Sequence, residues 1–298
     1  MAFPLKHILF PTDFSKNAEH ALFFAAEIAN RNGAALTLYH ASQDTMDFAP
    51  SFEHSKDETI HGANKHFDQL VKKLQQRKKY RDIEVSTMLQ SGQPITSLLN
   101  HIKEERPDLV VMGTKGATSN RNAVFGSVTT NLIQKSEVPV LAIPHGSGLD
   151  KFKNILFTTD YKEGDIAALE QTIGFAEFFN SNVDVLHVAD KKDLENDIKF
   201  RGFRDLITNR VSYENLNFHL IYENDFFPGI ADYLLDNPTS LLVMVRYKKT
   251  FWEKLAERDH SKEMAFYSNV PLLMLVGKEQ VERPLITKDA REEQNANY

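Results

Sequence analysis

Three glycines and a serine are spaced so that they could hold a phosphate. Gly113, Gly116, Gly126 and Ser127 lie within VVMGTKGATSNRNAVFGSV, residues 110–128, in the pattern G-x2-G-x9-G-S. Glycine lets the backbone approach a ligand with no Cβ in the way, and the first N–H groups of a helix have no acceptor within it. The spacing therefore predicts a phosphate cradle. Ordinary loop glycines, with Ser127 as a helix N-cap, would explain the same residues.

Alternating strands and helices must position these residues. Apolar runs predict strands at residues 7–11, 35–41, 83–89, 109–112 and 138–143. Helical spacing predicts helices at 56–79, 94–105 and 126–136, and an alanine-rich helix that ends at Gly33. Strands that alternate with helices imply a parallel sheet covered on both faces, which is an α/β fold.

The second half of the chain repeats the first. KNILFTTDY at 153–161 repeats KHILFPTDF at 6–14, and VDVLHV at 183–188 repeats LTLYHA at 36–41. A short Gly/Ser linker, residues 145–150, separates the copies. We therefore expect one domain at 1–147 that carries the glycine motif, a degenerate copy at 151–277, and a polar C-terminal extension at 278–298.

Composition limits the function. With 298 residues, 42% hydrophobic and 26% charged, the chain is typical of a soluble protein of two domains. The chain contains no cysteine, so disulfides, thiolate metal sites and cysteine nucleophiles are excluded. A net charge of −6 gives no case for binding nucleic acid. The first ten residues, MAFPLKHILF, predict neither a signal peptide nor a membrane span, so we expect a cytoplasmic protein without nucleic-acid or membrane partners.

Several motifs together resemble the universal stress protein family. They are PTDFS at 11–15, YHA at 39–41, VVMGTKG at 110–116, the nine-residue spacer, GSV at 126–128 and SEVPVLAIP at 136–144. The resemblance covers residues 3–144 well and 152–277 more weakly, so the chain is similar to a tandem, two-domain member. It implies two doubly wound domains, each a five-stranded parallel sheet of order 3-2-1-4-5 with helices on both faces. It also implies ATP, with or without Mg²⁺, as a regulatory ligand in a stress response.

The resemblance assigns nucleotide contacts to individual residues. In the order 3-2-1-4-5, strands one and four are neighbours whose connections leave to opposite faces, which opens a crevice at their carboxyl ends. Asp13 would accept from ribose hydroxyls or the adenine edge, Ala41 would face the adenine, and Met112 would pack near both. Taken alone, Asp13 is as well explained as a helix N-cap, and Met112 is better explained as a core residue. The full set of predicted contacts is Pro11, Thr12, Asp13, Ala41, Met112, Gly113, Gly116, Gly126, Ser127 and Val128.

No sequence pattern predicts a catalytic residue or a metal ligand. The chain has no G-x4-G-K-[ST], G-x-G-x-x-G or H-E-x-x-H motif, and His54, His61 and His66 are expected on a solvated surface. Lys115 and Arg121 could meet a triphosphate, or could simply be solvated. Three functions stay open: an ATP-binding regulatory protein, a slow ATP hydrolase or other nucleotide-using enzyme, and an interaction scaffold that binds no nucleotide.

The two halves are expected to pack as an intramolecular pseudo-dimer. Residues 138–143 and 270–276 are apolar runs at the presumed sheet edges, and an unpaired apolar edge is a liability. Antiparallel pairing of these two strands would remove both edges. The arrangement is also compatible with a further homodimer of the tandem chain.

The nucleotide is expected in the first half alone. Aligning VVMGTKG with LVMVRYK and SEVPVL with SNVPLL needs no gap, and every cradle position then changes in the second half. Asp160 matches Asp13 but is explained as a helix cap. The cradle changes are Gly113 to Val245, Gly116 to Lys248, Gly126 to Arg258 and Ser127 to Asp259.

Overall fold

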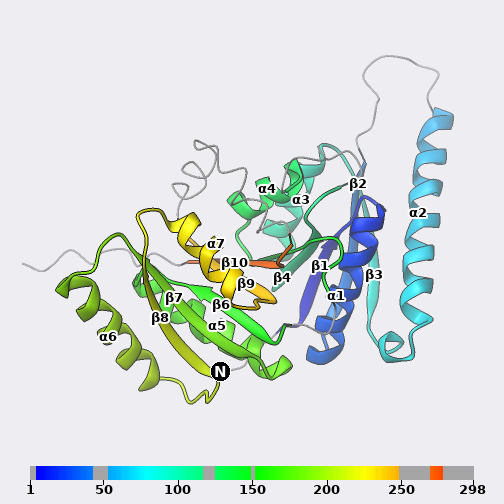
Figure 1. Ribbon diagram of the computed structural model, residues 1–298. Helices are drawn as coiled ribbons and strands as arrows, with labels where there is room; N and C mark the ends of the chain where they lie inside the picture. Colours follow the sequence, from blue (N-terminus) through cyan, green and yellow to red (C-terminus); the bar gives the residue numbers. More distant parts are fainter. Residues whose placement is uncertain (1–4, 43–52, 117–124, 149–151, 248–268, 278–298) are drawn as a thin grey trace, which may run out of the picture.

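Ten strands form one continuous sheet through the molecule, and helices lie on both of its faces (Figure 1). The computed structural model describes residues 5–42, 53–116, 125–148, 152–247 and 269–277. The strand order is β3-β2-β1-β4-β5-β10-β9-β6-β7-β8. Among the described residues, no helix is both long enough and apolar enough to cross a membrane.

Strands and helices alternate along both halves of the chain. The first half contains β1 (His7–Pro11), α1 (Lys16–Asn32), β2 (Ala35–Ser42), α2 (Glu53–Gln75), the 3₁₀ helix η1 (Lys78–Tyr80), β3 (Val85–Ser91), α3 (Pro94–Glu105), β4 (Leu109–Gly113), α4 (Ser127–Lys135) and β5 (Val140–Ile143). The second contains β6 (Asn154–Thr158), α5 (Glu163–Phe179), β7 (Asn182–Ala189), α6 (Leu194–Thr208), β8 (Leu216–Tyr222), α7 (Phe226–Asp236), β9 (Leu241–Arg246) and β10 (Leu272–Val276).

Each half is a parallel five-stranded unit of order 3-2-1-4-5, as the family resemblance implies. The strand register also repeats between the halves. The pairing of His7 with Ala35 recurs as Asn154 with Asn182. The pairing of Val110 with Val140 recurs as Leu242 with Leu272, so these strands align without a gap. The predicted fold class, two tandem doubly wound α/β units, is confirmed.

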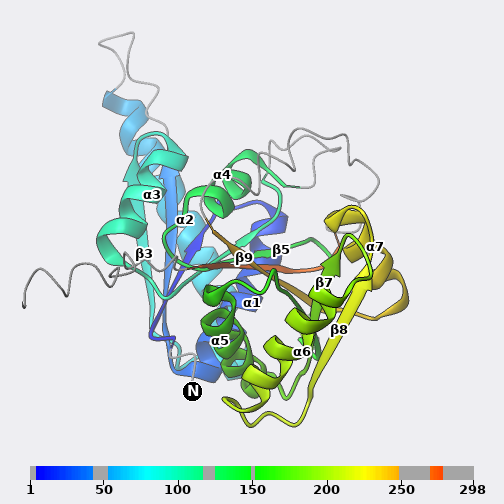
Figure 2. The ribbon, with the colours of Figure 1, turned by 90° about the vertical axis from the view of Figure 1, so that its left-hand side faces the viewer.

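Two apolar layers hold the helices to the sheet. One layer joins α1, α2, α5 and α6 to one face, and the other joins α3, α4 and α7 to the opposite face. Figure 2 shows α5 and α6 below the sheet and α4 above it. Because β1 and β4 are neighbours and their helices α1 and α4 lie on opposite faces, their carboxyl ends form a switch point.

The predicted helix at 56–79 is divided in the structure. Helix α2 ends at Gln75, and η1 then turns the chain so that Tyr80 is buried. The Tyr80 hydroxyl donates to the Glu27 carboxylate at 3.0 Å. If α2 continued as a straight helix, Tyr80 would not reach α1. The break at Gln75 therefore allows the Tyr80 ring to be buried against α1. The third strand also begins later than predicted, at Val85.

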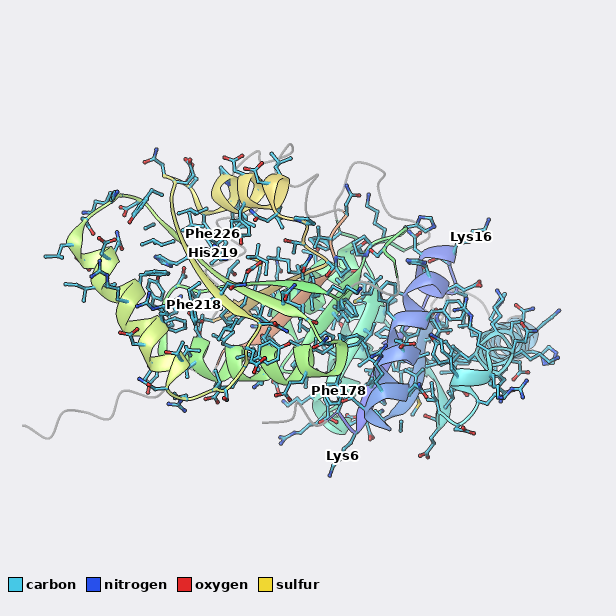
Figure 3. The ribbon with its side chains drawn as sticks, turned by 60° about the horizontal axis from the view of Figure 1, so that its bottom comes forward. Lys6, Lys16, Phe178, Phe218, His219 and Phe226 are labelled. Carbon is cyan, nitrogen blue, oxygen red and sulfur yellow. The ribbon has the colours of Figure 1, made fainter. Side chains whose placement is uncertain are left out.

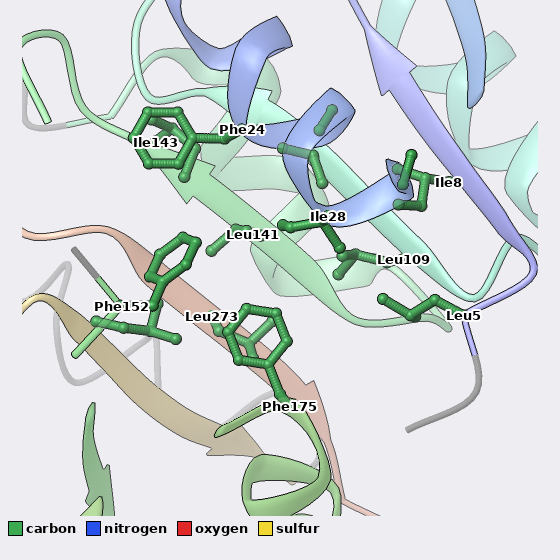
Figure 4. Close-up of a cluster of buried hydrophobic side chains, with 14 of the residues drawn as sticks. Leu5, Ile8, Phe24, Ile28, Leu109, Leu141, Ile143, Phe152, Phe175 and Leu273 are labelled. Carbon is green, nitrogen blue, oxygen red and sulfur yellow. The ribbon is translucent and has the colours of Figure 1, made fainter. Parts of the chain in front are cut away.

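The two halves meet where β5 and β10 pair antiparallel, in the arrangement that the sequence predicts for these edges. Leu273 lies opposite Leu141, and Met274 lies opposite Val140. Figure 4 shows Leu141 and Leu273 beside Phe152 and Phe175 in one buried cluster. One apolar core therefore extends across both halves.

Candidate functional site

A cavity of about 250 Å³ opens at the carboxyl ends of β1 and β4. Its volume is slightly below the range of about 300–1,000 Å³ that is typical of small-molecule sites. All ten residues predicted as nucleotide contacts line this one cavity. They come from the ends of β1, β2 and β4, the loop after β4, and the start of α4. The fold thus brings together three stretches that are far apart in the sequence: 11–13, residue 41 and 112–128.

Further lining residues escaped the sequence prediction. Pro94 and Leu98 belong to α3, which follows β3 at the same edge of the sheet. The helical periodicity of 94–105 could have placed Leu98 against the sheet, but no sequence signal places it at a cavity. The other additional lining residues are Ala18, Tyr39, His40 and Thr129, with Lys115 also present.

The loop after β1 is held by hydrogen bonds to β2 and by one within the loop. Thr12 N–H donates to Tyr39 O at 2.8 Å, and Phe14 N–H donates to Thr12 Oγ1 at 3.0 Å. His40 Nδ1–H donates to Thr12 O at 2.7 Å. Phe14 adopts a left-handed conformation with φ 61°, which turns the chain from β1 into α1. These contacts fix Thr12 at the cavity wall.

Asp13 is not the helix cap. Ser15 is the N-cap of α1, and its Oγ accepts from Ala18 N–H at 3.2 Å. The exposed Asp13 carboxylate instead accepts from Ser15 N–H at 3.0 Å and lines the cavity. The capping explanation of Asp13 is therefore wrong, because the left-handed turn at Phe14 moves the start of the helix to Ser15.

Gly113 is required by close backbone packing as well as by the cavity. A Cβ added there would lie 3.2 Å from Asn17 O and 3.5 Å from Ala18 N, both in the first turn of α1. Thr129 Oγ1 donates to Gly113 O at 3.1 Å, which fastens α4 to the end of β4. The glycine therefore lets α1, β4 and α4 converge.

The start of α4 differs in detail from the prediction. Gly126 is the N-cap, so Ser127 is the first helical residue rather than the cap. The Gly126 N–H donates to Thr114 O at 2.7 Å. It is therefore not available to a ligand, contrary to the prediction. The amides of Ser127 and Val128 lie in the first turn, whose N–H groups have no acceptor within a helix. These two amides and the Ser127 hydroxyl are the donors at this end of the cavity.

Lys115 is half-buried beside the glycines and lines the cavity. Its carbonyl oxygen accepts from Asn17 Nδ2 at 3.3 Å, so the loop after β4 is attached to α1. Arg121, the second candidate cation, lies outside the described residues.

Two buried polar rings lie on the same side of the sheet as the cavity. Tyr39 and His101 stack with ring centroids 5.0 Å apart. Neither the Tyr39 hydroxyl nor His101 Nε2 has a hydrogen-bond partner among the described residues. Burial raises the pKa of Tyr39 to about 12 and lowers the pKa of His101 below its ordinary value. Both side chains are therefore neutral at pH 7.

The matching edge of the second half is built differently. Val245 on β9 takes the place of Gly113 on β4, as the register shows. Asp160 is exposed, and its carboxylate pairs with Lys162 Nζ at 3.5 Å. The N-cap of α5 is Lys162. The capping explanation of Asp160 is therefore wrong. The Tyr247 hydroxyl donates to the Asp165 carboxylate. Lys248, Arg258 and Asp259 lie outside the described residues.

Where side chains are described, no cluster of three or more His, Cys, Asp or Glu residues could hold a metal ion. His61 and His66 are exposed on α2, and the His66 ring stacks on Phe14 with centroids 5.0 Å apart. The side chain of His54 is outside the described part.

Comparisons with known proteins agree on one family. The model of the family described as "Universal stress protein family" matches residues 4–144. Universal stress protein YxiE of Bacillus subtilis is 25% identical over 143 residues, 46% of this chain and 97% of its own length. Universal stress protein MJ0577 of Methanocaldococcus jannaschii is 27% identical over 158 residues, 48% of this chain and 97% of its own. A crystal structure of a universal stress protein from Archaeoglobus fulgidus covers 93% of this chain and 98% of its own, with TM-score 0.72 and 18% identity. That structure supports the fold of both halves.

Proposed function

Because residues 4–144 place this chain in the universal stress protein family, we propose that it binds ATP in its first-half cavity as a regulatory ligand in a stress response. One observation carries the proposal. Ten residues chosen from the sequence for nucleotide contact line one cavity at the switch point between β1 and β4. Crevices at switch points are where doubly wound folds bind their ligands.

The chemistry of the cavity wall suits a nucleotide. Met112, Leu98 and Pro94 offer an apolar surface for a base, and Asp13 offers a carboxylate to hydroxyl or amine donors. The first-turn amides of α4, which also line the cavity, favour an anion through hydrogen bonds and the helix dipole. Lys115 adds a cation to the cavity wall. Mg²⁺, where it takes part, would enter with the phosphates, because it keeps several waters and few protein ligands in such sites.

Calorimetric titration with ATP tests the proposal. We expect about one ATP per chain, because the first half carries the glycines and the second has Val245 in place of Gly113. Gly126→Arg should abolish binding, since its side chain would enter the cavity. The backbone at Gly126, with φ −71° and ψ 162°, suits any residue, so the helix can still start there.

Two controls separate lost binding from lost folding. Gly202→Arg makes the same change on α6, where an added Cβ meets nothing within 4 Å, and should bind ATP normally. Gly113→Val with Gly126→Arg should also abolish binding, but Gly113→Val crowds the first turn of α1 and must be judged against its thermal unfolding. Two equivalent sites, or undiminished binding by Gly126→Arg, would contradict the proposal.

The same preparation distinguishes the alternative functions. Binding without turnover supports a regulatory ligand, and we assign no catalytic residue. Slow release of phosphate from ATP by the unaltered protein, together with its loss in Gly126→Arg, would indicate a weak ATPase. Failure to bind any nucleotide would leave an interaction scaffold. We place the regulatory role in the cytoplasm, in keeping with the cysteine-free composition.

We also propose that the chain is an intramolecular pseudo-dimer of the units 1–147 and 151–277, with 278–298 as an extension. The antiparallel pairing of β5 with β10 supports this arrangement, because it joins the fifth strands of the two units. A homodimer of the whole chain would then use other surfaces. Sedimentation equilibrium distinguishes the 34.0 kDa monomer from that homodimer.

A further inference from the structure

In the second half, a buried carboxylate, that of Asp165, lies at the position that corresponds to part of the cavity wall in the first half. Asp165, on α5, is 1% exposed. Its Oδ2 accepts from Thr159 Oγ1 at 2.7 Å, Asp160 N–H at 2.9 Å and Lys162 N–H at 3.1 Å. Its Oδ1 accepts from the Tyr247 hydroxyl, and Lys162 Nζ lies 4.6 Å from the centre of the Tyr247 ring. Both oxygens of the Asp165 carboxylate therefore accept hydrogen bonds from this chain's own groups.

The repeat relates this carboxylate to a residue of the first half. Helices α1 and α5 both contain 17 residues, and each follows a left-handed residue, Phe14 with φ 61° or Tyr161 with φ 58°. Thr12 N–H donates to Tyr39 O in the first half, and Thr159 N–H donates to Leu186 O in the second. Thr12 therefore corresponds to Thr159.

The position that corresponds to Asp165 is Ala18, the third residue of α1. Asp165 is likewise the third residue of α5. Ala18 lines the first-half cavity. By the same count along the strands, Lys115 stands where Tyr247 stands in the second half, two residues after Gly113 or Val245.

The hydroxyl oxygens of Thr12 and Thr159 accept equivalent hydrogen bonds, but the two hydroxyls differ in the bond that they donate. Thr159 Oγ1 accepts from Tyr161 N–H at 3.0 Å and donates its own hydrogen to Asp165. Thr12 Oγ1 accepts from Phe14 N–H at the same 3.0 Å. However, among the described residues nothing accepts the Thr12 hydroxyl hydrogen, although Thr12 is 7% exposed and lines the cavity. A buried donor of this kind needs an acceptor.

We propose that an anionic oxygen of the ligand, a phosphate oxygen of the nucleotide, accepts from Thr12 Oγ1 above Ala18, in the place that the Asp165 carboxylate occupies in the second half. This inference rests on the proposed function and deepens it. A phosphate oxygen has the charge and acceptor character of a carboxylate oxygen. The first turn of α1 favours negative charge at this point, and Lys115, whose carbonyl oxygen accepts from Asn17 in that turn, lines the cavity. In the second half, Asp165 acts as a built-in substitute for the ligand.

Removing the Thr12 hydroxyl tests the position proposed for the phosphate oxygen. We expect Thr12→Val, which keeps the shape, to weaken ATP binding by about tenfold or more, as expected for a lost hydrogen bond to a charged group. Thr12→Ser keeps the hydroxyl and should bind nearly as the unaltered protein does. Adenosine, which has no phosphate, should bind Thr12→Val and the unaltered protein equally. Calorimetry with ATP and adenosine measures all three comparisons.

Transplanting the carboxylate gives an independent test. Ala18→Asp should abolish ATP binding, because the new carboxylate would take the Thr12 hydrogen and repel phosphate. The fold should persist, since α5 carries Asp at this position. Ala18→Asn, similar in size but neutral, should retain more binding than Ala18→Asp. Thermal unfolding of each variant checks the fold.

Three results would overturn this inference: ATP binding by Thr12→Val that equals the unaltered protein, an equal loss of adenosine binding, or ATP binding by a folded Ala18→Asp at normal affinity. Failure of the unaltered protein to bind ATP is a different result. It would contradict the proposed function, and it is measured first.

Discussion

His101 is buried in the structure although nothing in the sequence singles it out. Its ring stacks on Tyr39 at a 29° interplanar angle, and its Nε2 has no hydrogen-bond partner among the described residues. Burial lowers its pKa below the ordinary value of 6.5, against the opposing effect of Glu105 and Glu104. The unfolded chain therefore binds a proton more readily than the folded chain. It follows that stability is complete above the ordinary pKa and decreases as the pH falls below it.

His101→Phe should reduce this acid sensitivity. The substitution keeps an aromatic ring against Tyr39 and removes the titrating group without breaking a hydrogen bond recorded among the described residues. We expect a smaller loss of unfolding free energy between about pH 7.5 and about pH 5.5 than in the unaltered protein. Urea denaturation at the two pH values measures it. His61→Gln, at an exposed position, serves as the control, and an unchanged pH dependence in His101→Phe would show that another group is responsible.

At the scale of elements, one carboxylate attaches η1 to α1. Glu27 accepts from Arg31 Nε at 2.8 Å, Lys79 Nζ at 2.7 Å and the Tyr80 hydroxyl at 3.0 Å. Burial opposes the charged form, but the hydrogen bonds from Lys79, Arg31 and Tyr80 outweigh it and lower the pKa of Glu27. This contribution is complete above the ordinary value of 4.5 and is lost as the pH falls through the lowered pKa.

Glu27→Gln should lower the unfolding free energy at neutral pH by about 1 kcal/mol, because it weakens charged hydrogen bonds to three partners. The difference from the unaltered protein should shrink in acid. Glu195→Gln is the matched control, since Glu195 is exposed on α6 and pairs with Lys199 alone among the described residues, at 2.5 Å. That control should cost no more than about 0.5 kcal/mol. Equal effects of the two substitutions in urea denaturation would contradict the role given to Glu27.

At the scale of the whole molecule, the contact between β5 and β10 holds the halves together. Leu273 is 2% exposed and lies opposite Leu141 (Figure 4). On the helical side, Arg31 Nη1 donates to Phe178 O at 2.8 Å, from α1 to the end of α5, where Figure 3 labels Phe178. The Arg31 guanidinium also lies 4.7 Å from the centre of the Phe179 ring. We therefore expect the two halves to unfold together.

Leu273→Lys should loosen this contact. An ammonium group placed between Leu141 and Phe175 would be buried without a partner, at a cost of about 3 kcal/mol or more. Val140→Lys should act similarly from the opposite face of the sheet. We expect the unaltered protein to unfold in a single calorimetric transition and Leu273→Lys to unfold in two, with a larger hydrodynamic radius. Leu235→Lys, at an exposed site on α7, should change neither. A single, unshifted transition in Leu273→Lys would show that the halves are joined elsewhere.

Local patterns were sufficient for much of the fold and for the glycine-rich part of the cavity wall. Apolar periodicity located the strands, since strand and helix spacing depend on residues close in sequence. The repeat of KHILFPTDF as KNILFTTDY and the gapless match of the fourth and fifth strands predicted two units with the same register. The glycine spacing predicted the part of the cavity wall between Gly113 and Ser127, and the family resemblance supplied the parts at residues 11–13 and 41.

Contacts between distant segments depended on the tertiary structure. The Gly126 N–H donates to Thr114, Ser15 replaces Asp13 as the helix cap, and His101 is buried against Tyr39. The pairing of Asp165 with Tyr247 joins residues 82 positions apart, and no local spacing predicts it. Sequence patterns report which residues share an element or a face. They do not report which donor reaches which acceptor, because that depends on the packing of helices against the sheet to within a fraction of a hydrogen-bond length.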